Sequence, residues 1–229
     1  MDAPAPARSG LAARPLVAEF TGTAFLLAAV VGSGIMAETL STDVGLQLLQ
    51  NAFATAGVLV ALILTFGGAS GAHFNPAVTL SERVLGRLDS VTALAYVGAQ
   101  IAGGVVGVAA ANLMFDLPVL EASTKDRSAT HLVLAEFVAT IGLLVVIHGV
   151  VRSGRASTVA YAVGAYIGGA YYFTSSTSFA NPAVTIARTM SDTFAGIEPA
   201  SAPAFVGAQL AAVAVAAPLM GYLYPDPPG

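Results

Sequence analysis

The pentapeptide Asn-Pro-Ala-Val-Thr occurs twice in this chain, in "AHFNPAVTLSERV" (72–84) and in "FANPAVTIARTM" (179–190). Both segments are apolar, but both are too short to cross the hydrocarbon core of a bilayer, which takes about 20 helical residues. Asn is a preferred N-cap and Pro is favoured at the first helical position. Each copy therefore predicts the start of a short helix, one capped by Asn75 and one by Asn181.

The rest of the chain has the composition of a membrane protein. Of its 229 residues, 56% are hydrophobic and only 10% are charged, and the mean hydropathy is +0.78. This is too apolar for a soluble domain of ordinary size. Cysteine is absent, which excludes a disulfide framework and a Cys-ligated metal. Six apolar runs are long enough to span a bilayer, at about 15–37, 46–66, 91–115, 132–151, 156–173 and 203–224.

Two further short sequences also occur twice, and the three repeated sequences follow one another in the same order in both halves of the chain. Ala-Glu-Phe occurs at 18–20 and at 135–137, and Val-Gly-Ala-Gln occurs at 97–100 and at 206–209. These echoes indicate two homologous halves with three spans each. An odd number of spans turns the second half upside down in the membrane.

The expected architecture is all-α: six transmembrane helices and two re-entrant half-helices in an inverted repeat. Lys and Arg near span ends set orientation, and six of the nine favour placing both termini in the cytoplasm. These six are Arg8, Arg14, Arg83, Arg87, Arg152 and Arg155. The expected organisation is an N-terminal tail (1–14), a first repeat (15–115), an extracellular linker (116–130), a second repeat (131–224) and a C-terminal tail (225–229).

The inversion places the two half-helices N-terminus to N-terminus near the membrane midplane. Each N-terminus carries a partial positive charge of about half a unit, so a cation between them is repelled. The side-chain amides of Asn75 and Asn181 can donate hydrogen bonds to a passing oxygen. Irregular backbone at this depth is tolerated where it lines a wet cavity. The pattern therefore suits a narrow pore for small neutral solutes.

The paired motifs "GAHFNPAVT" and "SFANPAVTIAR" resemble those of the aquaporin and aquaglyceroporin (major intrinsic protein) family, over about residues 15–224. The resemblance implies a homotetramer in the bilayer, with one pore per subunit that conducts water or small uncharged solutes without energy coupling. It also implies that His73 lines the cytoplasmic half of the pore. The motif residues that it assigns to the pore are Asn75, Pro76, Ala77, Asn181, Pro182 and Ala183.

One departure from the family pattern bears on the substrate. Most relatives have Arg directly after the second Asn-Pro-Ala, in the narrow outer filter, but this chain has Val184. Spacing from the motif places the other filter positions at Gly169, at Ser178 and at either Thr55 or Ala54. All are small, so we expect a wide filter that passes solutes larger than water and opposes charge less strongly.

A similar Val occurs in a bacterial subgroup of aquaglyceroporins associated with arsenic resistance, which suggests glycerol-type polyols and arsenous acid as solutes. The Ala-, Gly- and Val-rich composition indicates a bacterial protein, and we expect it in the inner (plasma) membrane. Arg188 lies four residues after Val184, one turn along the same helix face. It is a candidate to replace part of the missing charge. The alternative is a solvated arginine at the end of the short helix.

Glu19 and Glu136 lie within apolar spans, where an isolated charge is costly. They could couple ion movement in a secondary transporter, which also uses inverted repeats and broken helices. Their equivalent places in the two halves favour a structural role, in which each accepts hydrogen bonds from a re-entrant loop. Tyr171, Tyr172 and Phe173 are expected to form an interfacial aromatic belt rather than part of the filter.

No catalytic motif is visible, so we expect no enzyme activity, cofactor, metal site or nucleic-acid partner. A passive channel is the favoured function. A secondary transporter is the main alternative, and an adhesive membrane protein is a weaker one.

Overall fold

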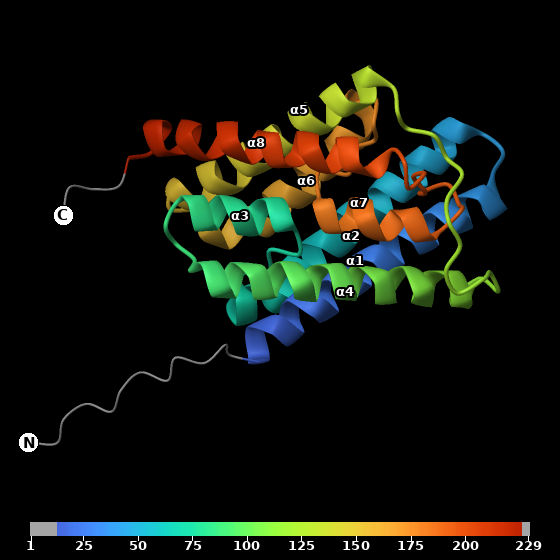
Figure 1. The fold of residues 1–229 in the computed structure, drawn as a ribbon, viewed down its shortest axis with the longest axis horizontal. Coiled ribbons are helices and arrows are strands. Elements are labelled where there is room, and N and C mark those ends of the chain that lie inside the picture. Colours follow the sequence, from blue (N-terminus) through green and yellow to red (C-terminus); the bar gives the residue numbers. More distant parts are fainter. Residues whose placement is uncertain (1–12, 226–229) are drawn as a thin grey trace, which may run out of the picture.

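The computed structural model describes residues 13–225, so most of the two expected tails, residues 1–12 and 226–229, lies outside the described part (Figure 1). Within residues 13–225 the secondary structure is entirely helical. The helices are α1 (Ala13–Leu40), α2 (Val44–Ser70), α3 (Pro76–Val84), α4 (Ser90–Met114), α5 (Thr130–Arg152), α6 (Val159–Phe173), α7 (Pro182–Ala187) and α8 (Ala202–Leu223). Two 3₁₀ turns, η1 (Ala156–Thr158) and η2 (Arg188–Met190), precede α6 and follow α7.

Five of the six expected spans are helices long and apolar enough to cross a membrane: α1, α2, α4, α5 and α8. The sixth, α6, has 15 residues. At 1.5 Å per residue it extends about 22 Å, less than the roughly 30 Å hydrocarbon core. The predicted apolar run 156–173 coincides with η1 and α6 together, so the tighter turn η1 begins this segment.

The two short helices α3 and α7 lie end to end in the middle of the bundle, between α4 and α8 in the view of Figure 1. Both start as the sequence predicts. The Asn75 Oδ1 atom accepts the N–H of Ala77 at 2.8 Å, and the Asn181 Oδ1 atom accepts the N–H of Ala183 at 3.0 Å. A proline follows each asparagine at the first helical position. These local caps define where each helix begins.

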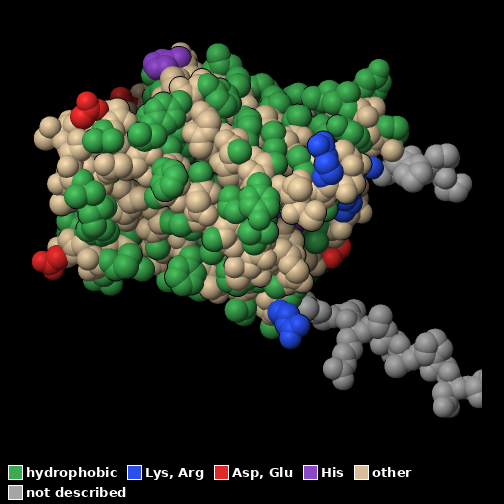
Figure 2. Space-filling model, turned by 180° about the vertical axis from the view of Figure 1, so that it is seen from behind, with side chains coloured by type: hydrophobic (Ala, Val, Ile, Leu, Met, Phe, Trp, Pro, Cys, Tyr) green, Lys and Arg blue, Asp and Glu red, His purple; other side chains and the backbone are tan. Residues whose placement is uncertain are grey.

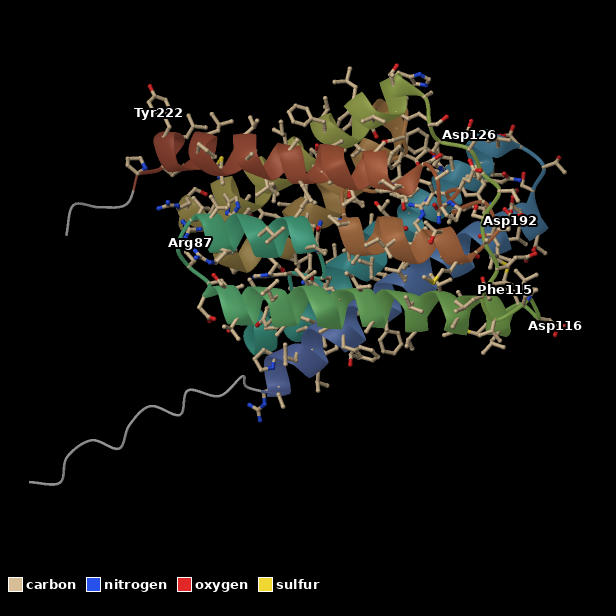
Figure 3. The ribbon with its side chains drawn as sticks, in the orientation of Figure 1. Arg87, Phe115, Asp116, Asp126, Asp192 and Tyr222 are labelled. Atoms are coloured by element: carbon tan, nitrogen blue, oxygen red, sulfur yellow. The ribbon has the colours of Figure 1, made fainter. Side chains whose placement is uncertain are left out.

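The surface has an apolar side wall between two charged ends. In Figure 2 hydrophobic side chains cover much of the wall, and most of the Lys and Arg visible gather at the end where the two termini lie. Phe53 and Leu94 on this wall are 80% and 72% exposed. Figure 3 places Arg87 at the terminal end and Asp126 and Asp192 at the opposite end. A belt of exposed apolar side chains between charged ends fits a bilayer-spanning bundle.

Helices α1 and α4 approach each other closely at two glycines. A Cβ atom on Gly103 would overlap the carbonyl oxygen of Phe20, and one on Gly107 would overlap that of Ala24. Gly98, on the same helix, has open space around its Cα. Small residues let membrane helices pack backbone to backbone, where dispersion contacts and not the hydrophobic effect hold them together.

We expect Gly107→Val to destabilise the folded protein by roughly 1–3 kcal/mol or more, because the added atoms force α1 and α4 apart. The measurement is the temperature at which half of the detergent-solubilised protein stays folded. Gly98→Val, on the exposed face of α4, is the matched control and should leave this temperature nearly unchanged. An equal loss in both variants would contradict the close packing.

Candidate functional site

The two half-helices are tied together at their N-termini by a reciprocal pair of hydrogen bonds. The Asn75 Nδ2 atom donates to the carbonyl oxygen of Ala180 at 2.8 Å, and the Asn181 Nδ2 atom donates to that of Phe74 at 2.8 Å. Each amide therefore donates one N–H to the opposite loop. The second N–H of each amide is the donor that remains for a solute.

The first re-entrant loop is held by the buried carboxylate of Glu19. Its oxygens accept the backbone N–H groups of His73 at 3.0 Å and Phe74 at 2.7 Å. They also accept from the Gln100 Nε2 atom at 2.7 Å, which in turn lies 2.9 Å from the Thr79 Oγ1 atom. The carboxylate thus connects α1, the loop, α3 and α4 in one network.

The second re-entrant loop is held in the same way by Glu136. Its oxygens accept the N–H groups of Phe179 at 2.9 Å and Ala180 at 2.8 Å. The Gln209 Nε2 atom donates to the carboxylate at 2.6 Å and lies 2.9 Å from the Thr185 Oγ1 atom. Each contact has its counterpart in the first loop. The three echoes seen in the sequence supply the Glu, the Thr and the Gln of this network.

Both loops follow the same strained backbone path. Ala72 and Phe74 have φ angles of 52° and 49°, and Ser178 and Ala180 have φ angles of 51° and 48°. Left-handed backbone at a residue other than glycine costs on the order of 1–3 kcal/mol. It persists where surrounding contacts determine it, and here the carboxylates and the asparagine amides provide those contacts.

One cavity of about 180 Å³ passes between the two loops, since both Asn75 and Asn181 line it. His73 also lines it, as expected, and its Nδ1 atom lies 3.0 Å from the Thr79 Oγ1 atom. Leu, Val and Ile side chains, mainly from α1, α2, α5 and α6, make up half of the lining residues. The cavity is therefore apolar with a few convergent polar groups, which is typical of a solute site.

The structure brings three of the expected filter residues to this cavity. Thr55, Ser178 and Val184 line it, and Ala54 does not, which selects Thr55 from the two residues that the spacing allowed. Gly169 is exposed on the outer face of α6 and does not reach the cavity. Its placement in the filter is therefore corrected.

From α6 the residue that lines the cavity at this level is Tyr171. Its side chain is buried, and its hydroxyl donates to the Thr55 Oγ1 atom at 3.1 Å. The expectation that Tyr171 joins an aromatic belt is wrong, whereas Tyr172 and Phe173 are 53% and 58% exposed. Tyr171 lies one helical turn after Ile167, which also lines the cavity, so both residues are on the same face of α6.

Arg188 lines the cavity rather than extending into solvent. Only 2% of it is exposed; its Nε atom donates to the carbonyl oxygen of Ala195, and its Cζ atom lies 3.3 Å from the centroid of the Phe179 ring. The guanidinium keeps its proton at neutral pH, as arginine side chains do in proteins. A positive charge is therefore present one turn beyond Val184.

A residue that the sequence did not single out, Glu82, lines the cavity on α3. Its Oε1 atom lies 3.2 Å from the Nδ1 atom of His148 and 3.5 Å from an Arg87 nitrogen. His148 is 1% exposed, and its Nε2 atom lies 2.9 Å from the Ser81 Oγ atom. Glu82 follows Val78 by four residues, as Arg188 follows Val184, and this parallel was visible in the repeat. Residues 13–225 contain no cluster of three metal-ligating side chains.

An inverted pair of Asn-Pro-capped half-helices around one cavity, inside an apolar helical bundle, defines a multi-pass membrane protein of the pore-forming class. The model of one protein family, described as major intrinsic protein, matches residues 7–170. The chain belongs to the major intrinsic protein family.

Relatives and a solved structure agree with this assignment. The chain is 50% identical over 210 residues to the aquaglyceroporin AqpS of Rhizobium meliloti (strain 1021), covering 92% of this chain and 90% of that protein. It is 32% identical over 150 residues to aquaporin NIP1-2 of Arabidopsis thaliana, half of whose length is covered. The fold matches the aquaglyceroporin structure from Plasmodium falciparum with a TM-score of 0.69 at 23% identity, covering 93% of this chain and 95% of that one. The expected aquaporin fold is confirmed.

We expect Glu136→Gln to destabilise the protein, because the new amide group presents N–H donors where two backbone N–H groups need acceptors. A buried donor left without a partner costs about 1–3 kcal/mol. Thermal unfolding in detergent measures the loss. Glu121→Gln removes the same charge from an exposed position and is the control. Equal stability of the two variants would show that the carboxylate does not hold the loop.

Proposed function

We propose that this protein is a passive channel for water and glycerol. The observation that carries the proposal is a cavity between two half-helices whose capping asparagines both line it. Such a cavity offers a few hydrogen-bond donors in an apolar wall, which suits solutes that exchange water for one or two polar contacts. The aquaglyceroporin that is 50% identical supports the same function.

The roles of individual residues follow from their positions. The two Asn-Pro-Ala triplets form the central constriction, His73 lines the pore wall, and Glu19 and Glu136 hold the loops in place. We further propose that the chain consists of two inverted repeats, 15–115 and 131–224, joined by the linker 116–130. The distribution of Lys and Arg supports cytoplasmic termini in a bacterial inner membrane. Assembly as a homotetramer rests on the family.

The outer filter is formed by Thr55, Ser178 and Val184, with Tyr171 in the place expected for Gly169. Val184 removes the bulk and the donors of an arginine, so the filter admits polyols, and arsenous acid is a further candidate solute. Tyr171 makes the wall bulkier on the α6 side than the sequence suggested, but its hydroxyl is already bonded to Thr55. Arg188 supplies the positive charge slightly beyond Val184.

An ion-coupled transporter is the less favoured function. Coupling needs a titratable group that exchanges partners during the cycle. Glu19 and Glu136 instead accept backbone N–H groups and a glutamine amide in matching geometry in both halves. Two equivalent, fully engaged carboxylates are what two static loops require.

The passive mechanism predicts glycerol flux that does not depend on an ion gradient. Stopped-flow light scattering on proteoliposomes should show glycerol permeability above that of empty vesicles, with a low activation energy. A protonophore should leave the flux unchanged. Loss of flux when the proton gradient is dissipated would favour the transporter instead.

Val184→Arg should lower glycerol permeability at least about tenfold, a barrier increase of about 1.4 kcal/mol, and should lower water permeability much less. The arginine narrows the cavity and adds a second guanidinium beside Arg188. Val184→Leu adds bulk without charge and is the matched control, with a smaller effect. Native vesicles that pass water alone would contradict the wide filter and would mean that Tyr171 or Arg188 already closes it to glycerol.

A further inference from the structure

Two buried arginines lie near one aromatic ring at the end of the cavity. The Cζ atoms of Arg188 and Arg127 are 3.3 Å and 5.0 Å from the centroid of the Phe179 ring. Arg127 comes from the linker and is 8% exposed. Its Nε atom donates to the carbonyl oxygen of Gly196 at 3.0 Å, and an Nη atom donates to that of Ser176 at 3.3 Å. Both guanidiniums are thus fixed in position by neutral partners.

The buried charges around this ring do not balance. Within residues 13–225 neither Arg127 nor Arg188 forms a salt bridge with a carboxylate. Glu136 is the buried carboxylate that interacts with both through space, and its oxygens already accept from the second loop and Gln209. Two positive charges therefore face one negative charge. Asp126 and Asp192, at the same end, are solvent-exposed, where charge is strongly screened.

A hydroxyl without a partner lies in the same part of the cavity. Ser178 is 3% exposed and lines the cavity next to Phe179, yet its Oγ atom has no hydrogen-bond partner in the structure. A buried polar group that is left without a hydrogen-bond partner is destabilising. Arg188 lines the same cavity. A positive charge and a hydroxyl without a partner that line one cavity suit a ligand with acceptor oxygens and a negative charge.

We infer that the Arg188 end of the cavity binds a small planar oxyanion, such as nitrate or a short carboxylate, between the guanidinium of Arg188 and the hydroxyl of Ser178. A planar guanidinium matches two oxygens of such an anion. This inference rests on the proposed channel function, because an anion bound here lies in the path of the solute. Small oxyanions are therefore competitors of glycerol at the cavity's Arg188 end.

The test compares glycerol permeability of proteoliposomes in sodium nitrate and in sodium gluconate at equal ionic strength, with the same salt on both sides. Gluconate is a larger, non-planar anion of the same charge and serves as the reference, and nitrate does not cross lipid as a neutral acid. Glycerol permeability of the native protein should fall at least about fivefold in roughly 100 mM nitrate, which corresponds to a Kd of about 25 mM or tighter. Flux in gluconate reports the proposed function on its own.

Three variants locate the site. Arg188→Met should abolish the nitrate effect, and Ser178→Ala should raise the nitrate concentration for half-inhibition at least about threefold. Lys125→Met is the control, because Lys125 carries a positive charge at the same end but donates to the carbonyl oxygen of Phe194 outside the cavity. It should keep the full nitrate effect. A loss of nitrate inhibition in Lys125→Met would overturn the site in the cavity and would indicate an effect of surface charge.

Other outcomes also decide the matter. Normal flux in gluconate with no nitrate effect on the native protein, or equal inhibition of Ser178→Ala and native protein, would overturn the site while leaving the channel intact. If no glycerol flux is seen, thermal unfolding in detergent reads binding directly. When nitrate replaces gluconate, the unfolding temperature of the native protein should then rise more, or fall less, than that of Ser178→Ala. Equal changes in the two proteins would overturn the site. If Arg188→Met fails to fold, the glycerol flux and the unfolding temperature of the native protein and of Ser178→Ala decide the matter.

Discussion

The buried carboxylates of Glu19 and Glu136 are the interaction on which the rest of this structure depends. Each half of the molecule carries non-helical backbone deep inside a bundle that spans a membrane, where no water is available to hydrogen bond its N–H groups. Each carboxylate accepts two of these N–H groups at 2.7–3.0 Å. The donors in turn stabilise the buried charge. The loops, the half-helices that they lead into and the cavity between them all follow from this pairing.

The three repeated sequences are one hydrogen-bonded unit built twice. The Glu of the first echo, the Thr of the second and the Gln of the third meet around each loop, although the chain separates them widely. Asn75 and Asn181 then join the two units by donating to each other's loops. Each half supplies acceptors that the other half needs, so the pairing of the two half-helices requires both halves to be folded.

Features that depend on a few neighbouring residues were easier to predict than the face that a helix turns toward the cavity. The caps at Asn75 and Asn181 depend on neighbouring residues, and Glu19 and Glu136 stand out because a charge in an apolar span requires partners. The face that α6 turns to the cavity was not predictable in the same way. This helix is apolar all round, so periodicity does not distinguish Tyr171 from Gly169. The partners of Arg127 and Arg188 are carbonyls of irregular segments, which leave no pattern in a sequence.

The backbone is nearly symmetric about the two asparagines, but the charges are not. Val78 and Glu82 on α3 correspond to Val184 and Arg188 beyond α7, and all four line the cavity. An acidic group, shared with Arg87 and His148, therefore stands at one end and a guanidinium at the other. The cavity therefore has unlike ends, with the two half-helix N-termini between them. A solute that moves through it meets the Glu82 carboxylate first from one side of the molecule and the Arg188 guanidinium first from the other.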